Sequence, residues 1–145
     1  MAENHLRWDS LGEFCALGES LDFLAEVTGN RKAAILGKAV ETATQGVLDN
    51  DRSPGRKVGQ PDNRDSHFWF ALYWAEALAA QSDDAELAAH FAQIAEKLKA
   101  GADAIVAELA AVQGGPAETG GNYHPDPAKV AAIMRPSTTL NAIID

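Results

Sequence analysis

Residues 66–81, SHFWFALYWAEALAAQ, carry aromatic and aliphatic side chains on almost every side of a predicted helix. The apolar members of this segment are Phe68, Trp69, Phe70, Leu72, Tyr73, Trp74 and Leu78. A helix that is apolar over most of its circumference has to be covered by other elements on most of its sides. We therefore expect this helix at the centre of the fold, with Phe70 and Trp74 in the core and other helices packed around it.

Two segments that precede this helix show the three- and four-residue spacing of apolar positions that predicts amphipathic helices. The first covers residues 6–27 and includes Cys15 on its apolar face, which predicts that Cys15 is a small core residue. Gly29 supplies a stop, and Asn30 supplies an N-cap for the second segment, residues 31–48. Because the connection is so short, the two helices are expected to run antiparallel.

The central helix and the helix that follows it both have polar residues suited to begin a helix. Asp65 or Ser66 is predicted to cap the central helix, and Asp83 with Glu86 has the spacing of a capping box. The fourth helix then carries a seam of apolar residues over 87–112. That seam is one surface through which the chain could pair with a second copy, although its use inside the chain is an equal alternative.

Two short helices are expected near the C-terminus. Asp126 followed by Pro127 is a favoured helix start, and Ser137 can cap a last helix that runs through Ile144. No segment shows the alternation that indicates a strand. The sequence therefore predicts an all-α fold in a single domain, residues 1–145, built as an antiparallel bundle of four main helices plus short C-terminal helices.

The charge and composition exclude several classes of protein. The net charge of -9 repels a polyphosphate backbone at long range, so nucleic acid is not expected as the main partner. No apolar run is long enough to cross a bilayer, so no membrane partner is expected either. The single cysteine cannot form an internal disulfide, and the first residues lack the pattern of a secretion signal. These features favour a cytoplasmic protein.

Two cationic stretches stand out in this acidic chain. Arg7 and Asp9 lie at the predicted start of the first helix, where unpaired backbone N–H groups and the helix dipole favour anions. Residues 53–64 form a loop between helices that carries further cations, namely Arg56, Lys57 and Arg64. We interpret the pair of stretches as an anion site for a phosphate. The alternative is that these arginines are solvated charges at the ends of helices.

The acidic residues and histidines do not form a recognisable metal motif. The aspartates near helix starts are better explained as caps and loop residues; they are Asp62, Asp65, Asp83, Asp84 and Asp126. The histidines lack the paired spacing of a zinc site; they are His5, His67, His90 and His124. His67 is expected to pack beside Phe68. No metal site and no catalytic residue are predicted on this chain.

Several unusual sequence blocks resemble the C-terminal part of the monomeric-type NADP-dependent isocitrate dehydrogenases. The blocks occur in the same order over almost the whole chain; they read NHLRWDSLGEF, SPGRKVG, DNRDSHFWFALYWAEALA, VAELAAVQG, GGNYHPDP and MRPSTTLNA. The chain departs from the family pattern at Asp65, where glycine is usual, at Asn122, where a second tyrosine is usual, and at Leu140, where phenylalanine is usual.

The resemblance implies a role in the oxidative decarboxylation of isocitrate to 2-oxoglutarate with NADP and a divalent metal, Mg or Mn. It implies that Arg7 and Arg56 correspond to the arginines that hold the 2′-phosphate of NADP, with Asp9 on the same half of the cofactor. Trp8 could shield the adenine, although an aromatic residue at a helix start is more often part of the core. The metal and isocitrate ligands of the family lie in preceding parts of its longer chains.

Two readings follow from these observations. In the first, the chain is the NADP-binding C-terminal segment of an isocitrate dehydrogenase and is not catalytic alone, with the remainder of the enzyme as its partner. In the second, it is a stand-alone, non-catalytic helical module that self-associates, for example as a homodimer. A defined dimer in the absence of any other part of the enzyme would favour the second reading.

Overall fold

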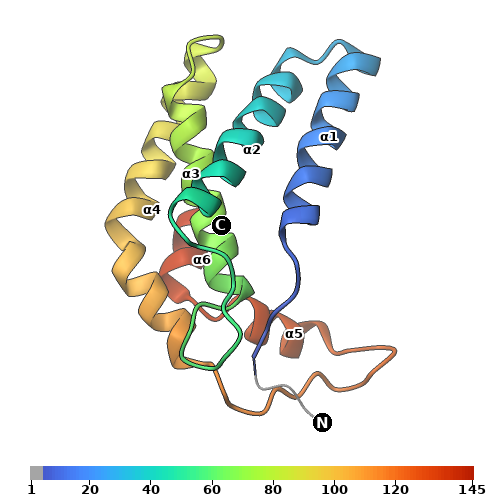
Figure 1. Ribbon diagram of the computed structural model, residues 1–145, viewed down its shortest axis with the longest axis vertical. Coiled ribbons are helices and arrows are strands. Elements are labelled where there is room, and N and C mark those ends of the chain that lie inside the picture. The colour runs from blue at the N-terminus through green and yellow to red at the C-terminus, as the bar shows by residue number, and fades with distance from the viewer. Residues whose placement is uncertain (1–4) are drawn as a thin grey trace.

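The computed structural model describes residues 5–145, and over that range it contains six α-helices and no strand (Figure 1). The helices are α1 (Leu11–Thr28), α2 (Arg31–Asp49), α3 (Asn63–Ala80), α4 (Ala85–Ala111), α5 (Pro127–Met134) and α6 (Thr138–Ile144). The predicted all-α class is thus confirmed. Within residues 5–145, no helix combines the length and apolar character that a membrane span requires.

Helix α3 lies at the centre of the bundle, as its sequence predicts. It packs against α2 on one side and α4 on the other, while α1 packs against α2 and α6 packs against α4 (Figure 1). Phe68 and Leu72 join one core cluster with residues of α4, and Phe70 joins a second cluster with Phe14 of α1 and Val40 of α2. Because α3 contributes to both clusters, it links the two halves of the hydrophobic core.

Most predicted helix ends are confirmed by hydrogen bonds. The Asn30 side chain accepts hydrogen bonds from two backbone N–H groups at the start of α2, and Asp126 and Ser137 each accept one from α5 and α6. Gly29 ends α1 in the left-handed region at φ 69°, and its N–H donates to the Ala25 oxygen. A residue with a Cβ would be strained in that conformation.

Three predicted helix starts are wrong in position. Helix α1 begins at Leu11 and not at residue 6, because residues 5–10 bond to the loop and to α3. Asp62 caps α3 in place of Asp65 or Ser66. Asp84 caps α4 in place of Asp83, because its side chain accepts the Leu87 N–H.

Two residues that the sequence placed in the core differ in burial: Cys15 lies outside the core, and Trp74 packs against it while staying partly exposed. Cys15 is exposed, because α1 turns Phe14 and Gly18 toward α2 and the next residue along points away. Trp74 is only partly buried, and its indole Nε1 donates to the Leu36 oxygen at 3.0 Å, whereas Phe70 is buried as expected.

The apolar seam of α4 is used inside the chain. Leu98, Ile105 and Leu109 are buried in the cluster that contains Phe68 of α3, and Val112 at the end of the seam is exposed. The middle of the seam therefore does not offer a surface for a second copy. The structure supports the alternative use that the sequence left open, an intramolecular face.

Asp65 is a buried carboxylate in the first turn of α3. It is only 5% exposed, and its Oδ1 atom has no hydrogen-bond partner within residues 5–145. Burial raises the pKa of the Asp65 carboxyl above its ordinary value, and the nearby Trp69 indole and Arg52 guanidinium oppose that rise only in part. The Arg52 guanidinium carbon lies 3.8 Å from the centre of the Trp69 ring. The charged form of Asp65 thus lowers the stability of the fold.

We expect Asp65→Asn to be more stable than the parent chain at pH 7, because it removes a buried charge. Because the pKa of Asp65 is raised in the folded chain, the ionised carboxylate costs the full amount of stability above that folded pKa. This cost disappears as the pH falls through the folded pKa toward the ordinary pKa of an aspartate. The stability difference should therefore shrink on acidification. Urea denaturation of both chains at a series of pH values measures it, with the exposed Asp103→Asn as the control; a difference that is constant with pH would contradict the assignment.

Glu108 of α4 fixes the start of α6. Its carboxylate accepts hydrogen bonds from Ser137 Oγ at 2.6 Å, from Thr139 Oγ1 at 2.7 Å and from the Thr139 N–H at 3.2 Å. These hydrogen bonds, from Ser137 first and then Thr139, lower the pKa of Glu108 below its ordinary value. One carboxylate thus serves as an acceptor for the whole first turn of α6.

Glu108→Gln should lower the thermal midpoint at pH 7, because the amide is a weaker acceptor for three donors than the carboxylate. A lowered folded pKa contributes stability that is present above the ordinary pKa and is lost as the pH falls through the folded pKa. Parent and variant should therefore melt at closer temperatures in acid. Glu96→Gln, an exposed change on the same helix, is the control; equal midpoints for Glu108→Gln and the parent at pH 7 would exclude this role.

Candidate functional site

The start of α3 is a buried polar junction that holds the N-terminal segment. Asn63 is fully buried, and its Oδ1 accepts the Trp8 N–H at 2.6 Å while its Nδ2 donates to the Trp8 oxygen and to Ser10 Oγ. Its own backbone N–H donates to the Leu6 oxygen at 3.0 Å. A single asparagine therefore pairs with residues 6–10 much as a neighbouring strand would.

An ion pair next to Asn63 ties the same junction to α5. Asp62 and Arg64 form a salt bridge at 2.6 Å between side chains that are 1% and 8% exposed. Arg64 Nη1 also donates to the backbone oxygen of Ile133 at 2.8 Å. Arg64 was one of the loop cations offered to an anionic ligand, but the structure commits its guanidinium to these internal partners.

Arg7 and Asp9 lie together at one cleft. They are exposed, and they line a cavity of about 240 Å³ with Trp8, Ser10, Leu11, Phe14, Val47, Ser53, Pro54 and Ser66. Asp9 Oδ1 accepts the Leu11 N–H at 3.1 Å, so the carboxylate is held at the start of α1. The predicted Arg7 and Asp9 are therefore brought to one place.

Arg56 belongs to the loop that borders this cleft, although its side chain is not part of the cleft wall. The loop residues Ser53 and Pro54 line the cleft, and His5 Nε2 donates to the Gly55 oxygen at 3.1 Å. Gln60 Oε1 accepts the N–H groups of Arg56 and Lys57, which closes the loop on itself. The exposed Arg56 thus stands next to residues that touch both the cleft and the N-terminal segment.

Ser66 is a cleft residue that the sequence pattern did not single out as a ligand. Its side chain is 1% exposed, and its Oγ has no hydrogen-bond partner among the described residues. A buried hydroxyl without a partner is uncommon and marks a place where a ligand or water can bond. The position of Ser66 near the start of α3 does not reveal an unpaired hydroxyl from the sequence, since a serine in a helix commonly bonds to the backbone.

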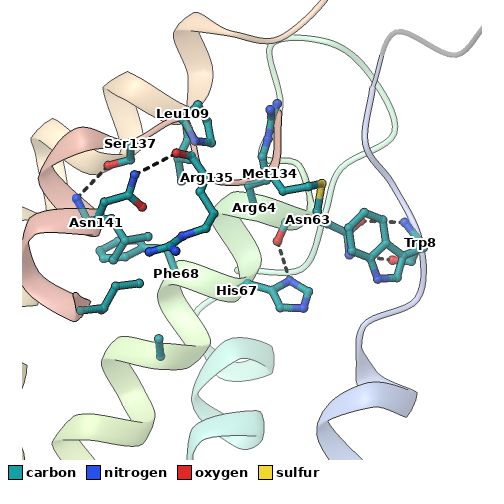
Figure 2. A pocket seen from close by; sticks show the side chains of 14 residues that line it. Trp8, Asn63, Arg64, His67, Phe68, Leu109, Met134, Arg135, Ser137 and Asn141 are labelled. Atoms are coloured by element: carbon teal, nitrogen blue, oxygen red, sulfur yellow. Dashed lines mark hydrogen bonds between the residues drawn. The ribbon is translucent and has the colours of Figure 1, made fainter. Parts of the chain in front are cut away.

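A second cavity, of about 300 Å³, is also lined by Trp8 (Figure 2). In Figure 2, Trp8 stands at one end of this cavity and Ser137 with Asn141 at the other. Its wall is mainly apolar and includes Phe68, Leu109, Met134, Leu140 and Ile144. Trp8 lines both cavities and is half-buried, so it serves as a partition and is neither a complete core residue nor a fully exposed one.

His67 helps to hold Trp8 and does not simply pack beside Phe68 as expected. Its Nδ1 donates to the Asn63 oxygen at 2.7 Å, and its Nε2 lies 3.3 Å from Glu13 Oε2. The His67 ring meets the Phe14 ring edge-on at 5.2 Å between centroids and the Trp8 ring at 5.9 Å. Trp8 Nε1 also donates to Glu13 of α1, so residues of α1 and α3 both contact the indole.

The described residues do not fit a metal centre. Over residues 5–145, no group of three or more His, Cys, Asp and Glu side chains lies close enough to hold an ion. Asp62 and Asp84 are N-caps, and Asp126 caps α5. These three carboxylates are thus explained by helix starts, as the sequence indicates, whereas Asp65 and Asp83 do not act as caps.

The chain is similar to proteins of one known family. The family model described as monomeric isocitrate dehydrogenase matches residues 1–145. The chain is 53% identical over 143 residues to the NADP isocitrate dehydrogenase 2 of Mycobacterium tuberculosis and to the NADP isocitrate dehydrogenase of Corynebacterium glutamicum. It is 51% identical over 144 residues to the enzyme of that name from Azotobacter vinelandii. Each match covers 99% of this chain but only 19% of the relative, so the chain spans about a fifth of the relatives' length.

Asn63→Ala should destabilise the fold by about 1–3 kcal/mol for each buried donor or acceptor that it leaves unpaired. The Trp8 backbone would lose both its bonds to the Asn63 side chain, so residues 5–10 should become more open to protease than α3 itself. Urea denaturation and limited proteolysis followed by mass spectrometry measure the two effects. Asn122→Ala in an exposed loop is the control, and unchanged cleavage of the N-terminal segment would show that Asn63 does not hold it.

Proposed function

This chain belongs to the monomeric isocitrate dehydrogenase family, and from that premise we propose that it forms the part of an NADP-dependent enzyme that binds the adenosine 2′-phosphate of the cofactor. In the complete enzyme this cofactor accepts a hydride as isocitrate is oxidised and decarboxylated to 2-oxoglutarate. Arg7 and Arg56 hold the phosphate, and Asp9 bonds to the same half of NADP. The chain supplies binding energy and cofactor selectivity, and no catalytic group.

The observation that carries the proposal is the meeting of Arg7, Asp9 and the Arg56 loop at one cleft. Arg7 and Asp9 line it directly, and Ser53 and Pro54 bring in the loop. These residues are about 50 positions apart in the chain, and the junction at Asn63 and the bond from His5 to Gly55 hold them together. Arg7 lines this cleft together with Ser53 and Pro54 of the Arg56 loop, which favours one shared anion site over two separate solvated helix ends.

The residues at this cleft suit the chemistry of a phosphate monoester. A 2′-phosphate is a compact dianion, and guanidinium groups from two separate elements can each donate two hydrogen bonds to it. The unpartnered Ser66 hydroxyl adds a neutral donor in the same wall. NAD has a hydroxyl in place of this phosphate, so both arginines act on the choice between the two cofactors.

The metal and the reacting carbons of isocitrate are assigned to the remainder of the enzyme. Residues 5–145 offer no cluster that suits Mg²⁺ or Mn²⁺, and both ions require several oxygen ligands at one point. The chain's residues therefore bind and orient the cofactor end that is remote from the reaction. This division explains how a segment of about a fifth of the relatives' length can affect turnover without touching the substrate.

The test is a hybrid enzyme in which the matched 143 residues of the Corynebacterium glutamicum relative are replaced by this chain. Arg7→Gln and Arg56→Gln should each raise the KM for NADP about 10- to 100-fold, since a hydrogen bond to a charged group is worth about 1.5–3 kcal/mol. The KM for isocitrate should stay within about twofold because the arginines make only cofactor contacts. Turnover with NAD should change much less than turnover with NADP.

Lys57→Gln is the matched control, since Lys57 is an exposed cation next to Arg56 in the same loop. It removes one positive charge from the same region, so it reports the long-range electrostatic effect alone. Equal changes in the KM for NADP in Lys57→Gln and Arg56→Gln would mean that the loop acts only through its positive charge and not through a direct contact of Arg56. An unchanged KM for NADP in both arginine variants would refute the proposal.

A further inference from the structure

Helix α1 has two apolar faces, and this chain covers only one of them. Phe14 and Gly18 are buried against α2, whereas Leu17, Phe23, Leu24 and Val27 are 36%, 65%, 42% and 60% exposed. At about 100° per residue, these four exposed residues fall within one third of the helix circumference, away from the buried side. We call the set Leu17, Phe23, Leu24 and Val27 the outer stripe.

The outer stripe lies at the edge of the bundle. Helix α1 packs extensively only against α2, and Figure 1 shows it on the opposite side of the bundle from α4. Four large apolar side chains on adjacent turns are more than the scattered single residues that protein surfaces normally expose. The stripe is therefore suited to be buried by another polypeptide surface.

The charges on α1 discriminate between two occupants of the stripe. Every charged residue of this helix is acidic, namely Glu13, Glu19, Asp22 and Glu26. A second copy packed symmetrically on the stripe would set one acidic helix against another, which is unfavourable. The relatives offer a different occupant, because about four fifths of their length has no counterpart in this chain.

We propose that the outer stripe of α1 is the surface on which the remainder of the isocitrate dehydrogenase fold docks. This inference rests on the part of the proposed function that places the chain in a complete enzyme, and it is independent of the contacts to NADP. The stripe then becomes an internal helix interface, and α1 becomes a helix covered on both sides. The outer stripe is thus exposed in the chain alone and buried in the whole enzyme.

The experiment compares the reactivity of a cysteine on the stripe in the chain alone and in the hybrid enzyme described above. The exposed Cys15 is first replaced by alanine, and Phe23→Cys or Val27→Cys is then introduced. Both proteins are treated with a small maleimide, and peptide mass spectrometry follows labelling at the introduced position. Labelling in denaturant gives the rate of the fully accessible thiol, and light scattering gives the oligomeric state of each protein.

We expect the two positions to react in the chain alone at a rate close to that of the denatured control. In the hybrid they should react at least about tenfold more slowly, because reaction then requires the interface to open. A second measurement is Phe23→Lys, which should leave the melting temperature of the chain alone unchanged and lower that of the hybrid. Neither readout depends on cofactor binding, so Arg7 and Arg56 could fail their own test while the docking surface stands.

Three results would overturn the proposal. The first is equal labelling rates in the chain alone and in the hybrid, since the stripe would then remain exposed. The second is a dimer of the chain alone in which Phe23→Cys is protected, since a second copy would be the occupant. The third is a hybrid that does not form a folded monomer, because the stripe would then fail to fit the relative's remaining fold.

Discussion

The paired hydrogen bonds between Asn63 and the N-terminal segment are the interaction on which the rest of the candidate site depends. Residues 5–10 belong to no helix, so nothing in their own sequence could place Arg7 and Asp9. Asn63 satisfies the backbone of Trp8 at both its N–H and its oxygen, and the buried pair of Asp62 and Arg64 keeps the start of α3 in position. Burial makes this junction costly to break, because any partner left behind is a polar group without water. Residues at the start of α3 therefore position the N-terminal segment that lines the cleft.

The fold could be predicted from the sequence where a local pattern determines the structure. The wide apolar surface of α3 required neighbours on both sides, and Asn30, Gly29, Asp126 and Ser137 have side chains or backbone freedom suited to the helix ends where they are found. The errors arose where several local choices were equivalent. Asp62, Asp65 and Ser66 can all cap a helix, and the structure selects Asp62, whose carboxylate is fully buried and paired with Arg64. Asp65 is then buried in the first turn of α3, and its Oδ1 atom has no hydrogen-bond partner among the described residues.

The candidate site divides in the same way. Arg7, Asp9 and Arg56 could be named because cationic stretches stand out in an acidic chain, and because the flanking blocks resemble a known family. Asn63 and Ser66 could not, since their importance lies in what surrounds them and not in their type. An asparagine and a serine at the start of a helix are ordinary. Here the Asn63 side chain is fully paired, and the Ser66 hydroxyl has no partner among the described residues. The unusual blocks of the sequence also include residues that stabilise the fold. Ser137, for example, donates a hydrogen bond to Glu108.

The first helix shows why a periodic pattern can be read correctly as a helix and wrongly as a single face. The spacing of its apolar positions predicts one face that includes Cys15, whereas the large apolar residues divide into an inner set around Phe14 and an outer set around Phe23. A helix that serves two interfaces has a less one-sided distribution of apolar residues than a surface helix, and spacing alone cannot tell the two faces apart. The distinction needs the partner that covers each face. Here α2 covers one face, and the proposed partner for the other is the part of the enzyme that has no counterpart in a chain of about a fifth of its relatives' length.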